Sequence, residues 1–166
     1  MRLLYNFSHY LNVMQQLNLP FYQTKTRQVG SRTEVFDVIR KIYVVLTPEE
    51  WVRQQFIHFL MQEKKYPASL ISIEKGIKVL GLQKRFDAVI SDRSGQAVAL
   101  IEFKSPDVKI TQKALEQISS YNLQLKVQFL IISNGMKHYC CKVDFEKRTF
   151  TFLNNIPEYN ELIIRD

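Results

Sequence analysis

The stretch KRFDAVISDRSGQAVALIEFKSP, residues 84–106, gives the clearest indication of the fold. It contains two runs rich in aliphatic and β-branched residues, 83–92 and 96–104, which flank the turn-forming pair Ser94-Gly95. Two such runs around a short glycine-containing turn are typical of a β-hairpin. The same stretch carries three ionisable candidates for a site, namely Asp87, Glu102 and Lys104.

The length of the hairpin loop decides whether these three side chains meet. Side chains alternate along a strand, so Glu102 and Lys104 share a face and Phe103 points the other way. With a two-residue loop at Ser94-Gly95, Asp87 lies directly opposite Glu102, with Cβ atoms about 4.5–5.5 Å apart. With a three-residue loop, Arg93–Gly95, Asp87 lies on the wrong face unless a β-bulge restores the alternation.

Two carboxylates at that separation repel each other unless a cation lies between them. Their oxygens suit Mg²⁺, which accepts one or two protein carboxylates and keeps several waters. Lys104 beside them would place a charge or a base next to the attacking water, which favours hydrolysis of a phosphodiester. The alternative is structural: a Glu-x-Lys sequence often forms a same-face ion pair, and a buried aspartate often ends a hairpin.

A helix is predicted to begin at Thr47-Pro48-Glu49-Glu50, which offers an N-cap hydroxyl, a proline at the first position and a glutamate at the third. An apolar stripe follows at helical spacing, and Lys64-Lys65 and Pro67 end the helix. The stripe consists of Val52, Phe56, Phe59 and Leu60. Glu50 has two interpretations: it lends a carboxylate to the site, or it serves the capping box, and the cap is the favoured one.

The remaining segments complete an α/β pattern. A strand over 70–80 precedes the hairpin, a second helix follows over 111–123, and residues 127–133 read as a strand buried on both faces. Lys137–Phe145 and Thr149–Leu153 predict a closing hairpin at one edge. In the second helix Gln117 and Tyr121 share a face, where they either support the carboxylates or simply pack. The order is helix, three strands, helix, strand, around a central mixed sheet flanked by helices.

Composition narrows the class of protein. The chain has 166 residues, of which 46% are hydrophobic and 23% charged, which excludes disorder and fibrous structure. Adjacent Cys140-Cys141 provide no disulfide framework, and the longest apolar runs are far too short for a membrane span, so a cytoplasmic protein is expected. The net charge of +7 favours a polyanionic partner such as nucleic acid.

The N-terminal segment differs from the rest in charge. Residues 1–33 contain no acidic residue, and we expect them to form a basic extension of a single domain over 34–166. The β-branched segment 35–46 is expected to form a strand that packs onto the body.

Taken together, the element order, Asp87, Glu102-Phe103-Lys104 and Gln117-x-x-x-Tyr121 resemble the PD-(D/E)XK nuclease superfamily. More narrowly, the chain is similar to the N-terminal nuclease domain of type I restriction enzyme R subunits, in a short stand-alone form. Four separated blocks carry this resemblance between Met14 and Tyr159, namely residues 36–54, 84–95, 100–112 and 133–146. Because relatives begin near the equivalent of Met14, residues Met1–Val13 are expected to lie upstream of the native start.

This resemblance implies roles for particular residues. Asp87 and Glu102 would be metal ligands together with the backbone carbonyl of Phe103, and Lys104 would be the catalytic lysine. Gln117 and Tyr121 would support the site, and the metal would be Mg²⁺, with Mn²⁺ as a substitute.

The resemblance also implies an endonuclease that acts on DNA, linked to restriction and defence. No phosphate-binding loop is present, since Leu82-Gln83 follow Gly76 and Gly81 where Lys and Ser or Thr are needed, so an ATP-driven motor would reside on a separate restriction-complex chain. The alternative is a non-catalytic module of the same fold that binds nucleic acid or assembles a complex.

Overall fold

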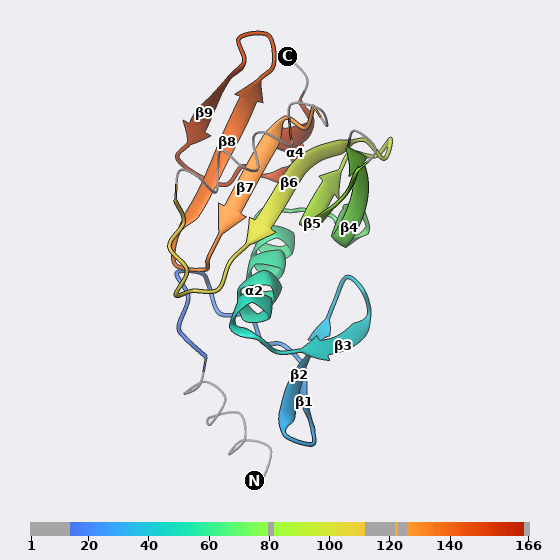
Figure 1. Ribbon diagram of the computed structural model, residues 1–166, viewed down its shortest axis with the longest axis vertical. Coiled ribbons are helices and arrows are strands. Elements are labelled where there is room, and N and C mark those ends of the chain that lie inside the picture. The colour runs from blue at the N-terminus through green and yellow to red at the C-terminus, as the bar shows by residue number, and fades with distance from the viewer. Residues whose placement is uncertain (1–13, 80–81, 112–121, 123–125, 165–166) are drawn as a thin grey trace.

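The computed structural model describes residues 14–79, 82–111, 122 and 126–164. Its main element is a six-stranded sheet of order β4-β5-β6-β7-β8-β9 (Figure 1). The strands are β4 Ile71–Val79, β5 Leu82–Ser91, β6 Ala97–Phe103, β7 Phe129–Ser133, β8 His138–Asp144 and β9 Thr149–Leu153. β6 and β7 run parallel, while the other neighbours run antiparallel. The predicted α/β class, mixed sheet and C-terminal hairpin β8–β9 are therefore confirmed.

The hairpin between β5 and β6 has the three-residue loop and not the two-residue one. Asp92 N–H donates to the Gln96 carbonyl at 2.8 Å, and Gly95 takes a left-handed conformation with φ +85°. Ser91 pairs with Ala97, but the next residue, Ile90, pairs with Ala99, which leaves Val98 as an extra residue. This β-bulge restores the alternation, so that Val89 faces Leu100 and Ala88 faces Ile101.

Apolar cores lie on both faces of the sheet, as the continuous apolar run of β7 predicts. All five residues of β7 are buried. Ile131 joins the core that contains Ile101 and Phe103, whereas Leu130 joins the core on the opposite face. Cys140 and Cys141 also divide between the two cores, so both thiols are buried.

Helix α2, Pro48–Gln62, covers one face of the sheet, as Figure 1 shows. The Thr47 hydroxyl accepts a hydrogen bond from Glu50 N–H at 3.0 Å, which confirms the predicted N-cap. Phe56 packs against Phe103 of β6, with ring centroids 5.5 Å apart. A short helix, α4 Tyr159–Ile163, packs into the same core. The sequence patterns above did not predict this helix.

A separate antiparallel sheet, β1-β2-β3, precedes α2. Its strands are β1 Thr26–Val29, β2 Arg32–Asp37 and β3 Ile42–Val45. The segment 35–46, predicted as one strand, is thus two strands joined by a turn in which Lys41 has a φ of +59°. β1 lies in the predicted extension, whereas β2 crosses residue 33 into the predicted domain. Because the two strands pair with each other, the predicted boundary falls inside this sheet.

The second predicted helix falls largely on residues 112–121 and 123–125, which lie outside the described part of the chain. Asn122 is described and buried, and its amide bonds with both the N–H and the carbonyl of Val127. Among the described helices, none combines the length and the apolar character needed to cross a membrane.

Candidate functional site

Asp87 lies on β5, next to the pair Ala88–Ile101 at which the ladder between β5 and β6 stops. Its carboxylate turns toward the end of β6, where Oδ2 accepts a hydrogen bond of 2.7 Å from Phe103 N–H. A backbone N–H that points at a carboxylate holds it in one orientation. The bulge at Val98 therefore delivers Asp87 to the strand end that carries Glu102 and Lys104.

Glu102 and Lys104 form an ion pair, with Lys104 Nζ 2.8 Å from Glu102 Oε1. Both side chains are half-buried. Lys104 follows β6, and its N–H donates to the Ser133 carbonyl of β7 at 2.9 Å, which fixes its backbone. The same-face contact that the alternation predicts is therefore present.

Charges crowd at this end of the sheet. Burial raises the pKa of Glu102, the Asp87 charge raises it further, and Lys104 partly offsets both. Burial alone would lower the pKa of Lys104, but its bond to Glu102 and the charge of Asp87 outweigh burial and raise it. Lys104 is thus held as a cation between carboxylates that repel one another.

A third carboxylate, Glu49 of α2, interacts electrostatically with Asp87 and Lys104, and the sequence interpretation missed it. Its side chain is exposed, but desolvation of the carboxyl group raises the pKa of Glu49, and Asp87 adds to the shift while Lys104 opposes it. Glu49, in the first turn of α2, thus interacts electrostatically with Asp87 of β5 and with Lys104, which follows β6. The available signal was spacing: Glu49 lies three residues before Val52 and seven before Phe56, the spacing of residues that share one side of a helix.

Glu50, which the sequence interpretation considered for the site, is engaged elsewhere. Its buried carboxylate forms an ion pair with Arg53 and accepts a 2.8 Å hydrogen bond from Gln54 Nε2. Its backbone N–H donates to the Thr47 hydroxyl, as an N-cap requires. Its carboxylate binds Arg53 instead of completing the capping box.

Three arginine side chains from different parts of the chain bind one glutamate of β4. Glu74 of β4, which has a left-handed φ of +52°, binds Arg40 at 2.7 Å, Arg53 at 3.4 Å, and Arg85. Arg40 lies after β2, Arg53 lies on α2 and Arg85 lies on β5. The network thus ties the small sheet and α2 to the strands that carry the candidate site.

The donor set fits a magnesium ion in chemistry. Asp87 and Glu102 provide carboxylate oxygens, and Phe103 could add its carbonyl, the hard ligands that Mg²⁺ prefers. Within the described residues, no group of three or more His, Cys, Asp and Glu side chains could hold a metal ion. Gln117 and Tyr121 lie outside the described residues, so their predicted support of the site stays a prediction.

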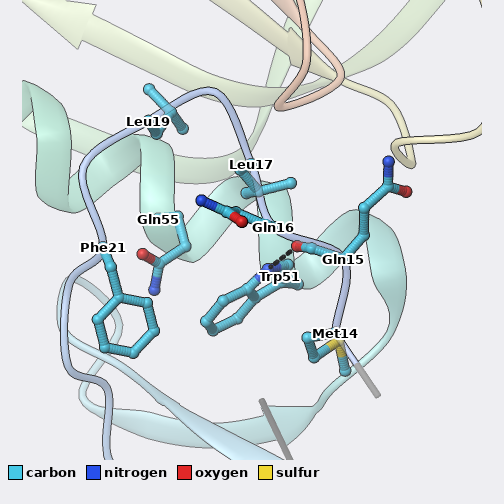
Figure 2. A pocket seen from close by; sticks show the side chains of 8 residues that line it. All are labelled: Met14, Gln15, Gln16, Leu17, Leu19, Phe21, Trp51 and Gln55. Carbon is cyan, nitrogen blue, oxygen red and sulfur yellow. Dashed lines mark hydrogen bonds between the residues drawn. The ribbon is translucent and has the colours of Figure 1, made fainter. Parts of the chain in front are cut away.

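A cavity of about 350 Å³ lies away from this group (Figure 2). The N-terminal segment from Met14 to Phe21 and two side chains of α2, Trp51 and Gln55, form its wall. Trp51 Nε1–H donates to the Gln15 carbonyl at 3.3 Å across it. None of Asp87, Glu102 and Lys104 lines the cavity, so it is separate from the candidate site.

Comparison with solved structures finds a fragment assigned to an HsdR subunit of a type I restriction enzyme from Vibrio vulnificus YJ016. The match has 21% sequence identity and a TM-score of 0.52, and it covers 70% of this chain and 24% of that one. This likeness shows the fold, which is restriction-endonuclease-like. A comparison with curated proteins gave no match.

The family model described as "Type I restriction enzyme R protein N terminus (HSDR_N)" matches residues 48–157. The matched residues run from the first turn of α2 to just before α4 and include Asp87, Glu102 and Lys104. Because they make up more than half of the sequence, the chain belongs to the family of type I restriction enzyme R protein N-termini.

Proposed function

We propose that this protein is a metal-dependent endonuclease that hydrolyses phosphodiester bonds of DNA in a restriction system. The observation that carries the proposal is the convergence of Asp87 of β5 with Glu102 and Lys104 at the end of β6, where the pairing between the two strands stops. Membership of a type I restriction enzyme family supports it independently. A module that only binds nucleic acid needs none of these three residues together.

In the proposal, Asp87 and Glu102 hold Mg²⁺, or Mn²⁺ in its place, with the Phe103 carbonyl as a further ligand. When bound, such an ion supplies Lewis acidity that polarises the phosphate and makes water a stronger nucleophile. The hydrogen bond from Phe103 N–H orients the Asp87 carboxylate toward this position. Burial and the charge of Asp87 together raise the pKa of Glu102, and a cation bound there would relieve both.

Lys104 is proposed as the catalytic lysine. As a cation beside Glu102, its ammonium group would stabilise charge that develops on the phosphate and orient the attacking water. Glu49, in the first turn of α2, would add negative charge near these groups without being a metal ligand. Gln117 and Tyr121 would support these groups from the segment after Thr111.

The proposed partners follow from the family. Type I R proteins give the family its name, so we propose that the chain acts with other chains of a restriction complex, which would supply any ATP-driven motor. The chain spans 24% of the length of the HsdR fragment that it resembles.

A cleavage assay on supercoiled plasmid and on single-stranded DNA, with Mg²⁺ or Mn²⁺, tests the proposal. We expect Glu102→Gln and Lys104→Met each to lower the cleavage rate by about 100-fold or more, the scale of lost electrostatic or acid–base groups. Glu146→Gln is the matched control, because it removes an equal charge at the turn between β8 and β9 and should cleave like the wild type.

Calorimetric titration with Mn²⁺ adds a readout that is independent of turnover. Binding should weaken in Asp87→Asn and Glu102→Gln and persist in Glu146→Gln. The proposal would be refuted if the wild-type protein bound no metal and cleaved neither DNA substrate. Retained DNA binding in that case would favour the non-catalytic module instead.

A further inference from the structure

The small sheet β1-β2-β3 presents one face to solvent that gathers basic and aromatic side chains. Directly paired residues of antiparallel strands lie on the same face. Arg27 pairs with Glu34, Val29 with Arg32, and Phe36 with Tyr43. Phe36 N–H also donates to the Lys25 carbonyl at 2.8 Å, which extends the pairing to Lys25. We call the side chains of Lys25, Arg27, Arg32, Phe36 and Tyr43 the basic face.

The opposite face of this sheet is the buried one. Val35 and Asp37, which alternate with Glu34 and Phe36 along β2, are 0% and 1% exposed. All four residues of β1 are exposed, as is Arg32. The basic face is therefore not needed to cover the core.

Contacts with two neighbouring side chains fix the conformation of Arg27 on the basic face. Its Nε lies 2.7 Å from Glu34 Oε2, and its guanidinium lies 4.1 Å from the centroid of the Tyr43 ring. The ring of Phe36 meets Tyr43 edge-on at 5.2 Å. A guanidinium fixed on two sides loses little conformational entropy when it binds an anion. Glu34, the acid on this face, balances one of the three cations, so positive charge remains in excess.

The basic face also lies at the end of the molecule that carries the candidate site. β3 leads through Leu46 directly into the first turn of α2, where Glu49 lies. Arg40, which follows β2, shares Glu74 with Arg53 of α2. Figure 1 shows the small sheet beside the start of α2, on the side toward which β6 runs.

We infer that the basic face is a contact surface for the phosphate backbone of DNA, next to the site. The inference rests on the proposed function and deepens it, because it says where the substrate extends beyond the cleaved bond. Lys25 and Arg32 would contact phosphates flanking the one bound by Arg27, while Phe36 and Tyr43 provide the apolar floor between them. Charge complementarity selects a polyanion, and the proposed function identifies that polyanion as DNA.

Fluorescence anisotropy with a short labelled DNA duplex, in EDTA so that no metal takes part, tests the inference on the full chain. The variant is Lys25→Gln with Arg32→Gln, which leaves Arg27 and its partners in place. The matched control is Lys147→Gln with Arg148→Gln, which removes the same charge at the turn between β8 and β9. Thermal unfolding of both variants should match the wild type, since all four side chains are exposed.

We expect the basic-face variant to bind at least about 10-fold more weakly than the control at moderate salt. The slope of log affinity against log salt concentration should fall in magnitude by about 2, because each lost phosphate contact removes roughly 0.9. Equal weakening in both variants would show that only net charge matters and would overturn the inference. Wild-type protein that binds no DNA at low salt would also overturn it.

The two proposals fail separately. If the basic-face variant loses DNA binding while wild type shows no metal-dependent cleavage, the contact surface stands and the nuclease proposal falls. If cleavage follows Glu102 and Lys104 while the basic-face variant binds like the control, the nuclease proposal stands alone.

Discussion

Gly135, in the turn between β7 and β8, shows how one residue fixes the path of the N-terminal segment. Its φ is +79°, and its carbonyl accepts a 2.8 Å hydrogen bond from Asn18 N–H. A Cβ at this position would lie 2.6 Å from Leu17 Cδ2 and 3.1 Å from Val52 Cγ2. The absence of a side chain therefore lets Leu17 reach the core beside α2.

We predict that Gly135→Ala lowers the free energy of unfolding by about 2–4 kcal/mol, combining left-handed strain with overpacking. Gly30→Ala is the matched control, since Gly30 also has a positive φ, +57°, but has nothing within 4 Å of an added Cβ. It should cost about 1 kcal/mol. Urea denaturation of both variants measures the difference, and equal losses would show that the contact with Leu17 is unimportant.

At the scale of elements, the β5–β6 hairpin depends on one extra residue. Val98 is unpaired between Ala97 and Ala99, and past it Ala99, Ile101 and Phe103 face the core under α2. Leu100 faces the other core. The bulge compensates for the odd loop length, so loop and bulge together determine where Glu102 points.

Deleting Val98 should therefore preserve the site. The pairs Ser91–Ala97 and Ile90–Ala99 would become consecutive without any shift in the rest of the ladder. We predict that the deletion lowers the free energy of unfolding by about 1–2 kcal/mol, because the partly buried Val98 side chain is lost. Mn²⁺ binding should be retained.

Deleting Leu100 should have the opposite outcome, because Glu102 would turn into the core under α2 and the protein should not fold. Circular dichroism and Mn²⁺ titration of the two deletions separate these cases. A folded Val98 deletion that has lost Mn²⁺ binding would mean that the bulge itself shapes the site.

At the scale of the whole molecule, a charge network joins the small sheet to the body. Asp37 is buried, and its carboxylate accepts hydrogen bonds from the N–H groups of Ile39 and Arg40 and from Arg40 Nε. Arg40 in turn binds Glu74 of β4 at 2.7 Å. Burial alone would raise the pKa of Asp37, but the bonds from Arg40 and Ile39 outweigh burial and lower it. The pKa of Glu74 is lowered in the same way by Arg85, Arg40 and Arg53.

These lowered pKa values predict acid sensitivity. An acid whose pKa is lower in the folded state stabilises the fold above its unfolded value, here 3.8 for Asp37, and loses that contribution as pH falls through the folded value. We expect Asp37→Asn to lose about 2 kcal/mol of stability at neutral pH. Its stability should also fall less steeply than that of the wild type between about pH 5 and 3. Denaturation curves across this range provide the measurement, and parallel curves would contradict the assignment.

The order of the elements could be predicted from the sequence because each depends on a local pattern. Thr47-Pro48 marks the start of α2, and alternation or continuous apolar runs mark β5, β6 and β7. The short helix α4 and the turn inside 35–46 were missed, since their patterns are brief and their burial comes from distant contacts, such as the hydrogen bond from Tyr159 to the Ser91 carbonyl. The family, likewise predicted from separated blocks, is confirmed by the match over 48–157.

The amino-acid sequence alone was enough to identify the charged candidates on and after the two hairpin strands, namely Asp87, Glu102 and Lys104. How these residues meet depends on the folded chain, because a bulge at Val98 has no reliable local signature and changes the face of every residue beyond it. The folded chain also distinguishes two adjacent glutamates: Glu49 interacts electrostatically with Asp87 and Lys104, while Arg53 of α2 and Arg40 bind the Glu50 carboxylate. Side-chain identity is local, but a shared position in space depends on register and packing across the whole chain.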